Sequence, residues 1–397
     1  MKELIEAVIN RYEDCVYSRF STKKLTFLDY NNELQAIREF SFLNFRTAGK
    51  SIENRPITAI EFGKGPTKIL IWTQMHGNES TATRALFDFF TALNAAENIE
   101  LRNLLSNELQ VLFLPMLNPD GAERYQRRNA LNIDPNRDAK KRVTPEIQTL
   151  FKIIEDFAPH WCFNMHDQRN LFNVSSTNKP ATISFLSPST SPEDGLSKGQ
   201  EEAMQLIATV ASNLSSVKDV GIARFSHEYY PTATGDNIQA MGYRTILVES
   251  GGYRNDPNRM IARKVVFESF FRSFAAIASE SWKKGRVKHY LSIPMNDKKL
   301  FDLLIRNVRL AASSEIRTDV GIEISETFDP SLNQVLQQSS VKDIGDLSHH
   351  YGYDEVDGSN GYISMPISLN QKADFDILFE KTTANKSTIF VRNGYMQ

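Results

Sequence analysis

The sequence predicts an α/β fold, in which a mixed, mostly parallel sheet has helices on both faces and a small, mainly β domain follows. Two observations support this fold class. Between residues 68 and 279, short apolar segments bounded by polar or turn residues alternate with amphipathic helical patterns. Buried parallel strands have this appearance, and the helices between them cover the two faces of a sheet. After residue 285, helical periodicity is weak and short alternating segments replace it.

The predicted strands of the main sheet are the apolar segments themselves. In chain order they are Lys68 to Thr73 (KILIWT), Leu109 to Pro115 (LQVLFLP), Trp161 to Met165 (WCFNM) and Thr245 to Glu249 (TILVE). Helical patterns lie between and after them, at residues 81–95, from residue 144 onward, at 199–215 and at 257–279. Thr144-Pro145-Glu146 marks the start of the second helix, because Pro is favoured at the first helical position.

Two domains are expected in a chain of this length, 397 residues. We place the boundary at Lys283-Lys284-Gly285-Arg286, which gives domains of residues 1–284 and 285–397. Within the first domain, residues 1–40 should form a helical lead-in. The second domain should be mainly β, with alternating segments at Phe301 to Val308, Val320 to Ile324 and Thr388 to Val391.

Composition narrows the functional classes. Hydrophobic residues make up 41% and charged residues 24%, with a formal net charge of −2, so neither disorder nor a nucleic-acid-binding surface is indicated. Cys15 and Cys162 are far apart, which argues against a disulfide framework and a thiolate zinc site. The N-terminal segment lacks an apolar signal region, and no stretch approaches the roughly 18 apolar residues of a membrane span. We therefore expect a cytoplasmic protein.

Three candidate metal ligands follow predicted strands. His76 and Glu79 lie directly after the first strand, and His166 follows the third. The carboxyl ends of parallel strands meet at one edge of a sheet, where α/β proteins build their sites. A His-x-x-Glu pair alone is weak evidence, but two His and one carboxylate form a known catalytic zinc set. The sequence therefore predicts one Zn²⁺ at this edge.

Glu249 ends the fourth predicted strand after four apolar residues. A carboxylate in this place is unfavourable to bury unless it is paired, bound to a metal or functional. Water activated by zinc needs a proton acceptor, and Glu249 is our candidate. Asp167, next to His166, is the first alternative.

A polar segment rich in turn residues and arginines lies between the two histidines. It contains Asn118-Pro119-Asp120-Gly121, a turn sequence, then Arg127-Arg128-Asn129 and Asn132 to Asp138. An arginine presents a planar fork that binds a carboxylate at two points, and it can also stabilise an oxyanion. A basic surface loop is the alternative reading.

Together these motifs resemble the zinc carboxypeptidases of the M14 family, over roughly residues 40–280. The family pattern is His-x-x-Glu, Asn-Pro-Asp-Gly, Arg-x-Asn, a Gly-Val-Asp-Leu-Asn-Arg-Asn-like segment, a strand-end His and a late strand-end Glu. In this chain the same order is His76-Gly77-Asn78-Glu79, Asn118-Pro119-Asp120-Gly121, Arg127-Arg128-Asn129, Asn132-Ile133-Asp134-Pro135-Asn136-Arg137-Asp138, His166 and Glu249.

The resemblance implies a role for each position. His76, Glu79 and His166 correspond to the metal ligands, and Glu249 corresponds to the general base. Arg127 corresponds to the oxyanion-stabilising arginine, although a shift of one residue would give Arg128 that role instead.

The resemblance also implies which residues bind the substrate. Asn136 with Arg137 corresponds to the clamp on the substrate's terminal carboxylate. Tyr229 and Tyr230 are both candidates for the mobile tyrosine that caps the substrate. Asp236 lies where the pocket for the substrate's side chain is expected, and there it would favour a basic or amine-bearing residue. An aspartate in a turn, capped by Gly235, is an equally good interpretation.

Three residues depart from the family pattern and could reshape the pocket. Pro135 replaces the usual Leu, Asp138 replaces the usual second Asn, and Asn132 stands where Gly is common.

The expected activity is removal of C-terminal amino acids from peptides or peptide-like substrates with a free carboxylate. One alternative is an N-acyl amino-acid deacylase resembling aspartoacylase, which shares the metal pattern and the clamp. Another is a zinc- or peptide-binding module without catalysis, although such a module needs neither Glu249 nor Arg127.

Overall fold

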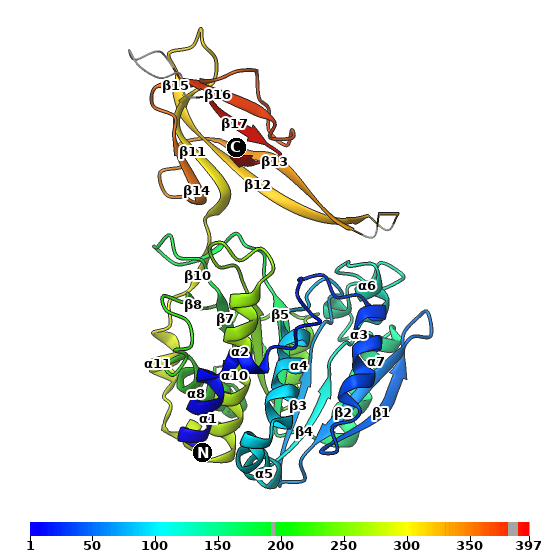
Figure 1. Cartoon of the computed structure of the whole chain (residues 1–397). Helices are drawn as coiled ribbons and strands as arrows, with labels where there is room; N and C mark the ends of the chain where they lie inside the picture. Colours follow the sequence, from blue (N-terminus) through cyan, green and yellow to red (C-terminus); the bar gives the residue numbers. More distant parts are fainter. Residues whose placement is uncertain (192–194, 330, 333, 380–387, 397) are drawn as a thin grey trace. The chain divides into compact units, whose positions relative to one another are not determined.

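The computed structural model describes residues 1–397 except 192–194, 330, 333, 380–387 and 397. The described residues form two compact units (Figure 1). The first unit contains residues 1–168 and 181–296, and the second contains 169–180 and 297–397.

The first unit is built on a mixed eight-stranded sheet. In spatial order its strands are β1 (Leu43–Lys50), β2 (Pro56–Phe62), β4 (Leu109–Leu114), β3 (Thr67–Trp72), β5 (Trp161–Asp167), β9 (Arg244–Ser250), β7 (Ile183–Leu186) and β8 (Ile222–Arg224). The central strands β4, β3, β5 and β9 are mutually parallel, and they are the four strands expected from the apolar segments. Antiparallel pairing occurs toward the edges, between β1 and β2, β2 and β4, and β7 and β9.

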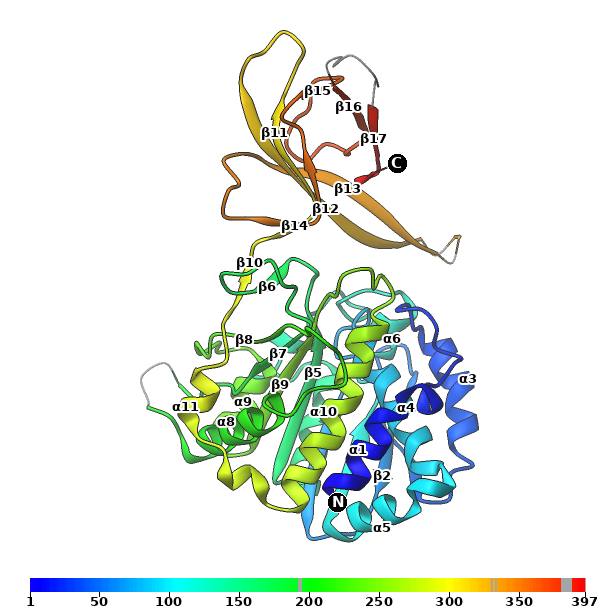
Figure 2. The ribbon, with the colours of Figure 1, turned by 60° about the vertical axis from the view of Figure 1, so that its left-hand side comes forward.

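Helices cover both faces of this sheet, which confirms the expected fold class (Figure 2). Alternate residues of β3 separate the faces: Ile69 and Ile71 join one apolar cluster, while Leu70 and Trp72 join another. The helices of this unit are α1 (Lys2–Asn10), α2 (Tyr12–Cys15), α3 (Phe27–Ile37), α4 (Thr81–Asn94), η1 (Ala96–Asn98), α5 (Ile99–Glu108), α6 (Pro119–Glu123), η2 (Pro135–Arg137), α7 (Pro145–Phe157), α8 (Lys198–Ala211), α9 (Thr234–Ala240), α10 (Met260–Ala278), η3 (Ser281–Lys284) and α11 (Val287–Leu291). Among the described residues, no helix is long and apolar enough to cross a membrane.

The second unit contains a second sheet. Its strands run in the order β13 (Gln334–Gly345), β12 (Arg317–Asp329), β11 (Leu300–Arg309), β15 (Gly361–Ile363), β16 (Phe375–Phe379), β17 (Thr388–Arg392) and β18 (Tyr395–Met396), and β14 (Tyr351–Asp357) also pairs with β11. A separate short pair joins β6 (Phe172–Val174) to β10 (Asn296–Lys298). The expected mainly β character of the C-terminal region is therefore confirmed.

The two units differ from the domains expected from a boundary at residue 285. Residues 285–296 belong to the first unit, because Tyr290 of α11 is fully buried in its apolar core. Residues 169–180, directly after β5, belong instead to the second unit. Sequence periodicity does not reveal this insertion, since it is short and its neighbours are ordinary strands.

Candidate metal centre

The loop after β3 is shaped by a buried glutamine. Gln74 has a φ of 48°, in the left-handed region that non-glycine residues seldom adopt. Its side chain donates to the carbonyl of Gly77 at 2.8 Å and accepts a hydrogen bond from the Thr83 hydroxyl of α4 at 2.9 Å. These bonds connect the end of β3 to α4 and turn the intervening His76 and Glu79 toward one edge of the sheet.

The Asn118-Pro119-Asp120-Gly121 motif packs backbone to backbone against this loop. A Cβ atom on Gly77 would lie 1.9 Å from the carbonyl carbon of Gly121, so no side chain fits at Gly77. Asn118 donates to the carbonyl of Met75 at 3.1 Å and accepts from the amide of Gly121 at 2.9 Å. The motif therefore fixes the position of the loop that carries the candidate ligands His76 and Glu79.

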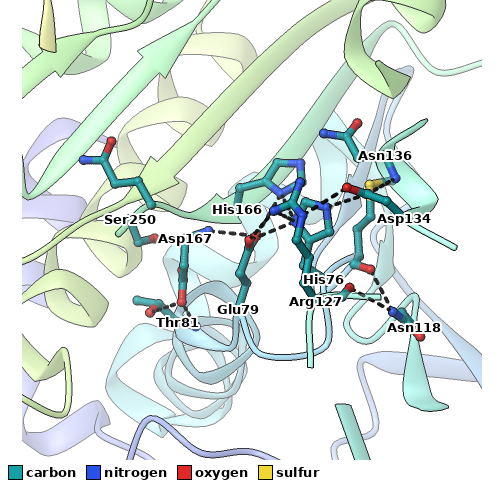
Figure 3. Close-up of polar contacts among 12 residues, drawn as sticks. His76, Glu79, Thr81, Asn118, Arg127, Asp134, Asn136, His166, Asp167 and Ser250 are labelled. Carbon is teal, nitrogen blue, oxygen red and sulfur yellow. Dashed lines mark hydrogen bonds and ion pairs between the residues drawn. The ribbon is translucent and has the colours of Figure 1, made fainter. Parts of the chain in front are cut away.

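The three predicted ligands come together in the structure (Figure 3). Glu79 lies 2.8 Å from Nδ1 of His76 through Oε1 and 2.9 Å from Nδ1 of His166 through Oε2. The two Nδ1 atoms are 3.1 Å apart, and His76, Glu79 and His166 are 1%, 8% and 2% exposed. Two imidazole nitrogens and a carboxylate converging in a buried place fit a catalytic zinc site, which uses three such ligands and keeps one position open.

Asp134 orients the first histidine. Its Oδ1 lies 3.1 Å from Nε2 of His76, and its Oδ2 accepts from Nε of Arg127 at 3.0 Å. A carboxylate acceptor at Nε2 favours the tautomer with the proton on Nε2, which leaves the Nδ1 lone pair for a metal. Asp134 lies two residues before Asn136 in the segment Asn132 to Asp138, but this motif by itself assigns it no role.

The electrostatics of the ligand cluster favour an anionic Glu79. Burial alone would raise the pKa of Glu79, but the charges and hydrogen bonds of His76 and His166 outweigh it and hold the pKa below its usual range. Burial lowers the pKa of His166, so the neutral imidazole that a metal requires is favoured there.

Glu249 lies beside the metal ligands on the neighbouring strand. In the parallel register of β5 and β9, Glu249 is directly opposite His166, so the two side chains share a face of the sheet. Among the described residues, Oε2 of Glu249 has no hydrogen-bond partner, and it is inaccessible to solvent. Burial, with the nearby Glu79 and Asp167 carboxylates, raises the pKa of Glu249 well above its usual range. A carboxyl group in this setting is suited to accepting and releasing a proton.

The structure distinguishes the two adjacent arginines. Nη1 of Arg127 lies 3.1 Å from Nδ1 of His76 and 3.3 Å from Oε1 of Glu79. Arg128 instead donates to the carbonyl of Asn132 at 2.9 Å, on the exposed side of the loop. Of these two arginines, Arg127 is the one whose guanidinium lies beside the candidate metal ligands.

The candidate substrate-binding residues form a second group. Oδ1 of Asn136 accepts from the amide of Thr234 at 3.0 Å, which joins the clamp segment to the start of α9. The guanidinium of Arg137 stacks 4.3 Å from the ring centre of Tyr230, and the amide of Tyr230 donates to Asp236 at 3.0 Å. Burial raises the pKa of Asp236 to about 6.

Of the two candidate tyrosines, Tyr230 is therefore the one that contacts Arg137. Tyr229 is half-buried, and in the described part of the chain no interaction links it to Arg137.

The departures from the family pattern have local structural reasons. Asn132 has a φ of 58°, and asparagine is among the few residues other than glycine that adopt this conformation readily. Asp138 accepts from the amide and hydroxyl of Thr144 at 2.8 and 2.7 Å, so it stabilises the start of α7. Pro135 occupies the first position of η2, where its missing N–H is not needed.

The fold and the donor set define the class as an α/β protein with a buried His-Glu-His group that could hold a metal ion at the carboxyl edge of a mixed sheet. The model of the zinc carboxypeptidase family matches residues 32–237, and the chain belongs to this family. The matched segment contains the three ligands and Arg127 and ends before Glu249.

Individual relatives agree with this assignment. Carboxypeptidase 2 of Trichophyton rubrum is 26% identical over 209 residues, which are 52% of this chain and 33% of that protein. Carboxypeptidase 2 of Trichophyton equinum is 26% identical over 226 residues, 56% of this chain and 36% of that protein. The chain thus spans about a third of the length of the curated relatives it matches. A metallo-carboxypeptidase from Burkholderia cenocepacia shares the fold, with a TM-score of 0.51 at 16% identity, covering 64% of this chain and 69% of that one.

Proposed function

We propose that this protein is a zinc-dependent carboxypeptidase that removes C-terminal amino acids from peptides. The observation that supports this most is the convergence of His76, Glu79 and His166 beside Glu249 on the adjacent strand. Catalysis belongs to the first unit in this proposal, and the second unit is accessory.

One Zn²⁺ would be held by His76, Glu79 and His166. When bound there, it supplies Lewis-acid chemistry that acidifies water and polarises a carbonyl group. Asp134 keeps the ring of His76 in the tautomer that leaves Nδ1 unprotonated.

The chain's own residues move the proton and balance the charge. Glu249 accepts the proton of the attacking water and returns it to the amine that leaves. Arg127, whose guanidinium lies beside His76 and Glu79, stabilises the negative charge that develops on the carbonyl oxygen.

Substrate selection is assigned to the second group of residues. Arg137 and Asn136 bind the free carboxylate of the terminal residue, for which the planar guanidinium is suited. Tyr230 covers the bound residue, since it already stacks on Arg137. Asp236 reads the side chain and, where it is ionised, favours a basic or amine-bearing one.

The direct test is a substrate panel with metal content measured on the same sample. Peptides with free C-termini should be cleaved, while the same peptides with amidated C-termini should resist, because the amide offers no carboxylate to Arg137. Equal cleavage of both forms would contradict the clamp. Preferential cleavage of N-acyl amino acids over peptides would replace the carboxypeptidase proposal with a deacylase.

A further inference from the structure

The chain passes between its two units at three places. These are the peptide bonds after Gln168, before Ala181 and after Asn296. Gln168, Ala181 and Asn296 all belong to the first unit, and Gln168 follows the candidate ligand His166 by two residues.

The side chain of Gln168 bonds to the residues at both other crossings. Its Nε2 donates to the carbonyl of Ala181 at 2.5 Å and to the Ser184 hydroxyl at 3.3 Å. Its Oε1 accepts from Nδ2 of Asn296 at 3.4 Å, a long hydrogen bond. Because Gln168 is only 5% exposed, these bonds form away from water, where an unpaired amide is unfavourable.

The backbone of Gln168 joins the strands of the candidate site. Its amide donates to the carbonyl of Ser250 at 2.8 Å, one residue after Glu249. Its carbonyl accepts from Nη2 of Arg259 at 2.6 Å, while Nη1 of Arg259 donates to the Ser250 carbonyl at 2.8 Å. Gln168 therefore holds together the carboxyl ends of β5 and β9.

The space around Gln168 is tightly filled. A Cβ atom on Gly251 would lie 2.5 Å from Nε2 of Gln168 and 1.9 Å from the carbonyl oxygen of Ala181. The amide of Gly251 donates to the carbonyl of Thr182 at 2.8 Å. A displacement of the crossing at Ala181 would therefore disturb both Gln168 and the segment that follows Glu249.

The residues that follow Gln168 are built into the second unit. Arg169 pairs with Glu323 at 3.0 Å, and the Tyr353 hydroxyl donates to the carbonyl of Asn170 at 2.9 Å. Strand β6 pairs with β10, of which residues 297 and 298 belong to the same unit. The second unit thus fixes the chain within three residues of His166.

We propose that Gln168 is a positioning residue that couples the metal centre to the three crossings between the units. Binding of a metal by His166 restricts the end of β5, and Gln168 transmits this restriction to Ala181 and Asn296. By thermodynamic linkage the coupling is reciprocal. A change that makes the chain at the three crossings more mobile therefore weakens metal binding by the same factor by which metal binding restricts the crossings. The proposal rests on the metal site proposed above but not on peptidase activity.

The test is hydrogen exchange of the full chain, with and without added Zn²⁺, followed by mass spectrometry. In the unmodified protein, zinc should slow exchange in two places: residues 76–82 of the metal loop and residues 169–174 after the first crossing. In Gln168→Leu, which keeps the size but removes the hydrogen bonds, the metal loop should still be protected. The zinc-dependent slowing at 169–174 should fall by about fivefold or more, and zinc affinity should fall by a similar factor.

Two further variants complete the design. Gln148→Leu makes the same change on the exposed face of α7 and should leave both regions unchanged. Asn296→Ala removes the hydrogen bond between Asn296 and Gln168, so the zinc-dependent slowing at 169–174 should fall by less than in Gln168→Leu. This variant keeps the proposal testable if Gln168→Leu does not fold.

Specific outcomes overturn the coupling. Zinc that protects 76–82 but not 169–174 in the unmodified protein would refute the coupling and leave the metal site standing. Full protection at 169–174 in both Gln168→Leu and Asn296→Ala would refute the role of Gln168. Absence of zinc-dependent protection everywhere would refute the metal site itself, and the coupling with it.

Discussion

The metal half and the substrate half of the candidate site are held in different ways. The metal half consists of the three ligands and Asp134, all buried and connected by hydrogen bonds of 2.8 to 3.1 Å. The substrate half consists of Asn136, Arg137, Tyr230 and Asp236, of which Tyr230 is 51% exposed. There, each hydrogen bond of these residues has a backbone group as one partner, and the side chains of Arg137 and Tyr230 meet in a stacking contact.

This difference shows which part of the site is preorganised by the fold. Buried charged groups need fixed partners, so the metal half has a single arrangement set by the end of β3, by β5 and by the loop that carries Asp134. An exposed arginine keeps most of its side-chain freedom and can turn from the tyrosine ring to a carboxylate. Changes in the metal half should therefore alter metal content or turnover, and changes in the substrate half should mainly alter substrate affinity.

The largest effect is expected from loss of a ligand. His166→Ala removes one of three donors, so zinc occupancy should fall strongly and activity should fall to background. The measurement is elemental analysis after dialysis. His160→Ala, at the other end of β5, provides a matched control and should keep full zinc content. Full zinc retention in His166→Ala would remove His166 from the site.

The next effect concerns the proton acceptor. Glu249→Gln is nearly isosteric and changes none of the proposed ligands, so the fold and the zinc should be retained. Because an amide cannot accept the water's proton, kcat should fall by about 10²–10⁴ or more with KM little changed. Steady-state kinetics with zinc content and thermal melting test this. Near-normal kcat would exclude Glu249 as the base, whereas loss of zinc would make Asp167 the next candidate.

A smaller effect should follow a change in the substrate half. Arg137→Lys keeps the charge but loses two-point binding of a carboxylate, so KM should rise by about tenfold with kcat less affected. Arg128→Lys is the control, because the guanidinium of Arg128 donates to the Asn132 carbonyl on the exposed side of the loop. If Arg137→Lys instead lowered kcat with KM unchanged, the division between the two halves would fail.

The difference between the metal half and the substrate half also explains which residues could be predicted from the sequence. His76, Glu79, His166 and Glu249 follow apolar strands, and parallel strands bring their carboxyl ends together, so local patterns suffice to group these residues. The central strands and the long helices were predictable for the same reason. The outer strands β1, β2, β7 and β8 were not, because polar residues interrupt the apolar patterns of β1 and β2, and β7 and β8 have only four and three residues.

Other features depend on contacts between distant segments. The choice of Arg127 over Arg128 depends on how the loop turns, which the two adjacent arginines do not reveal. The role of Asp134 depends on its distance from His76, 58 residues earlier in the chain. The insertion at 169–180 joins residues more than a hundred positions later, so no local pattern reveals it.

The smallest expected effect concerns Asp236 and depends on pH. Burial raises its pKa from the ordinary 3.8 to about 6, so between these values the folded protein holds a proton that the unfolded chain releases. Stability contributed by the neutral form is therefore present at low pH and is lost as pH rises through about 6. Asp236→Asn keeps a neutral acceptor for the Tyr230 amide, so it should raise stability above pH 6 by up to about 3 kcal/mol and change little near pH 4.

Substrate preference gives the same residue a second, independent measurement. If Asp236 reads the terminal side chain, its ionised form should favour lysine over leucine at the C-terminus. The ratio of kcat/KM for lysine-ended to leucine-ended peptides should then rise severalfold as pH passes through about 6, in step with the pKa of Asp236. In Asp236→Asn the ratio should be flat across this range, because no carboxyl group titrates there. A rise that persists unchanged in the variant would show that another group reads the side chain. A stability gain above pH 6 without any change in preference would make Asp236 a buried turn residue that only orients Tyr230, and the substrate half would then lack an acidic selector.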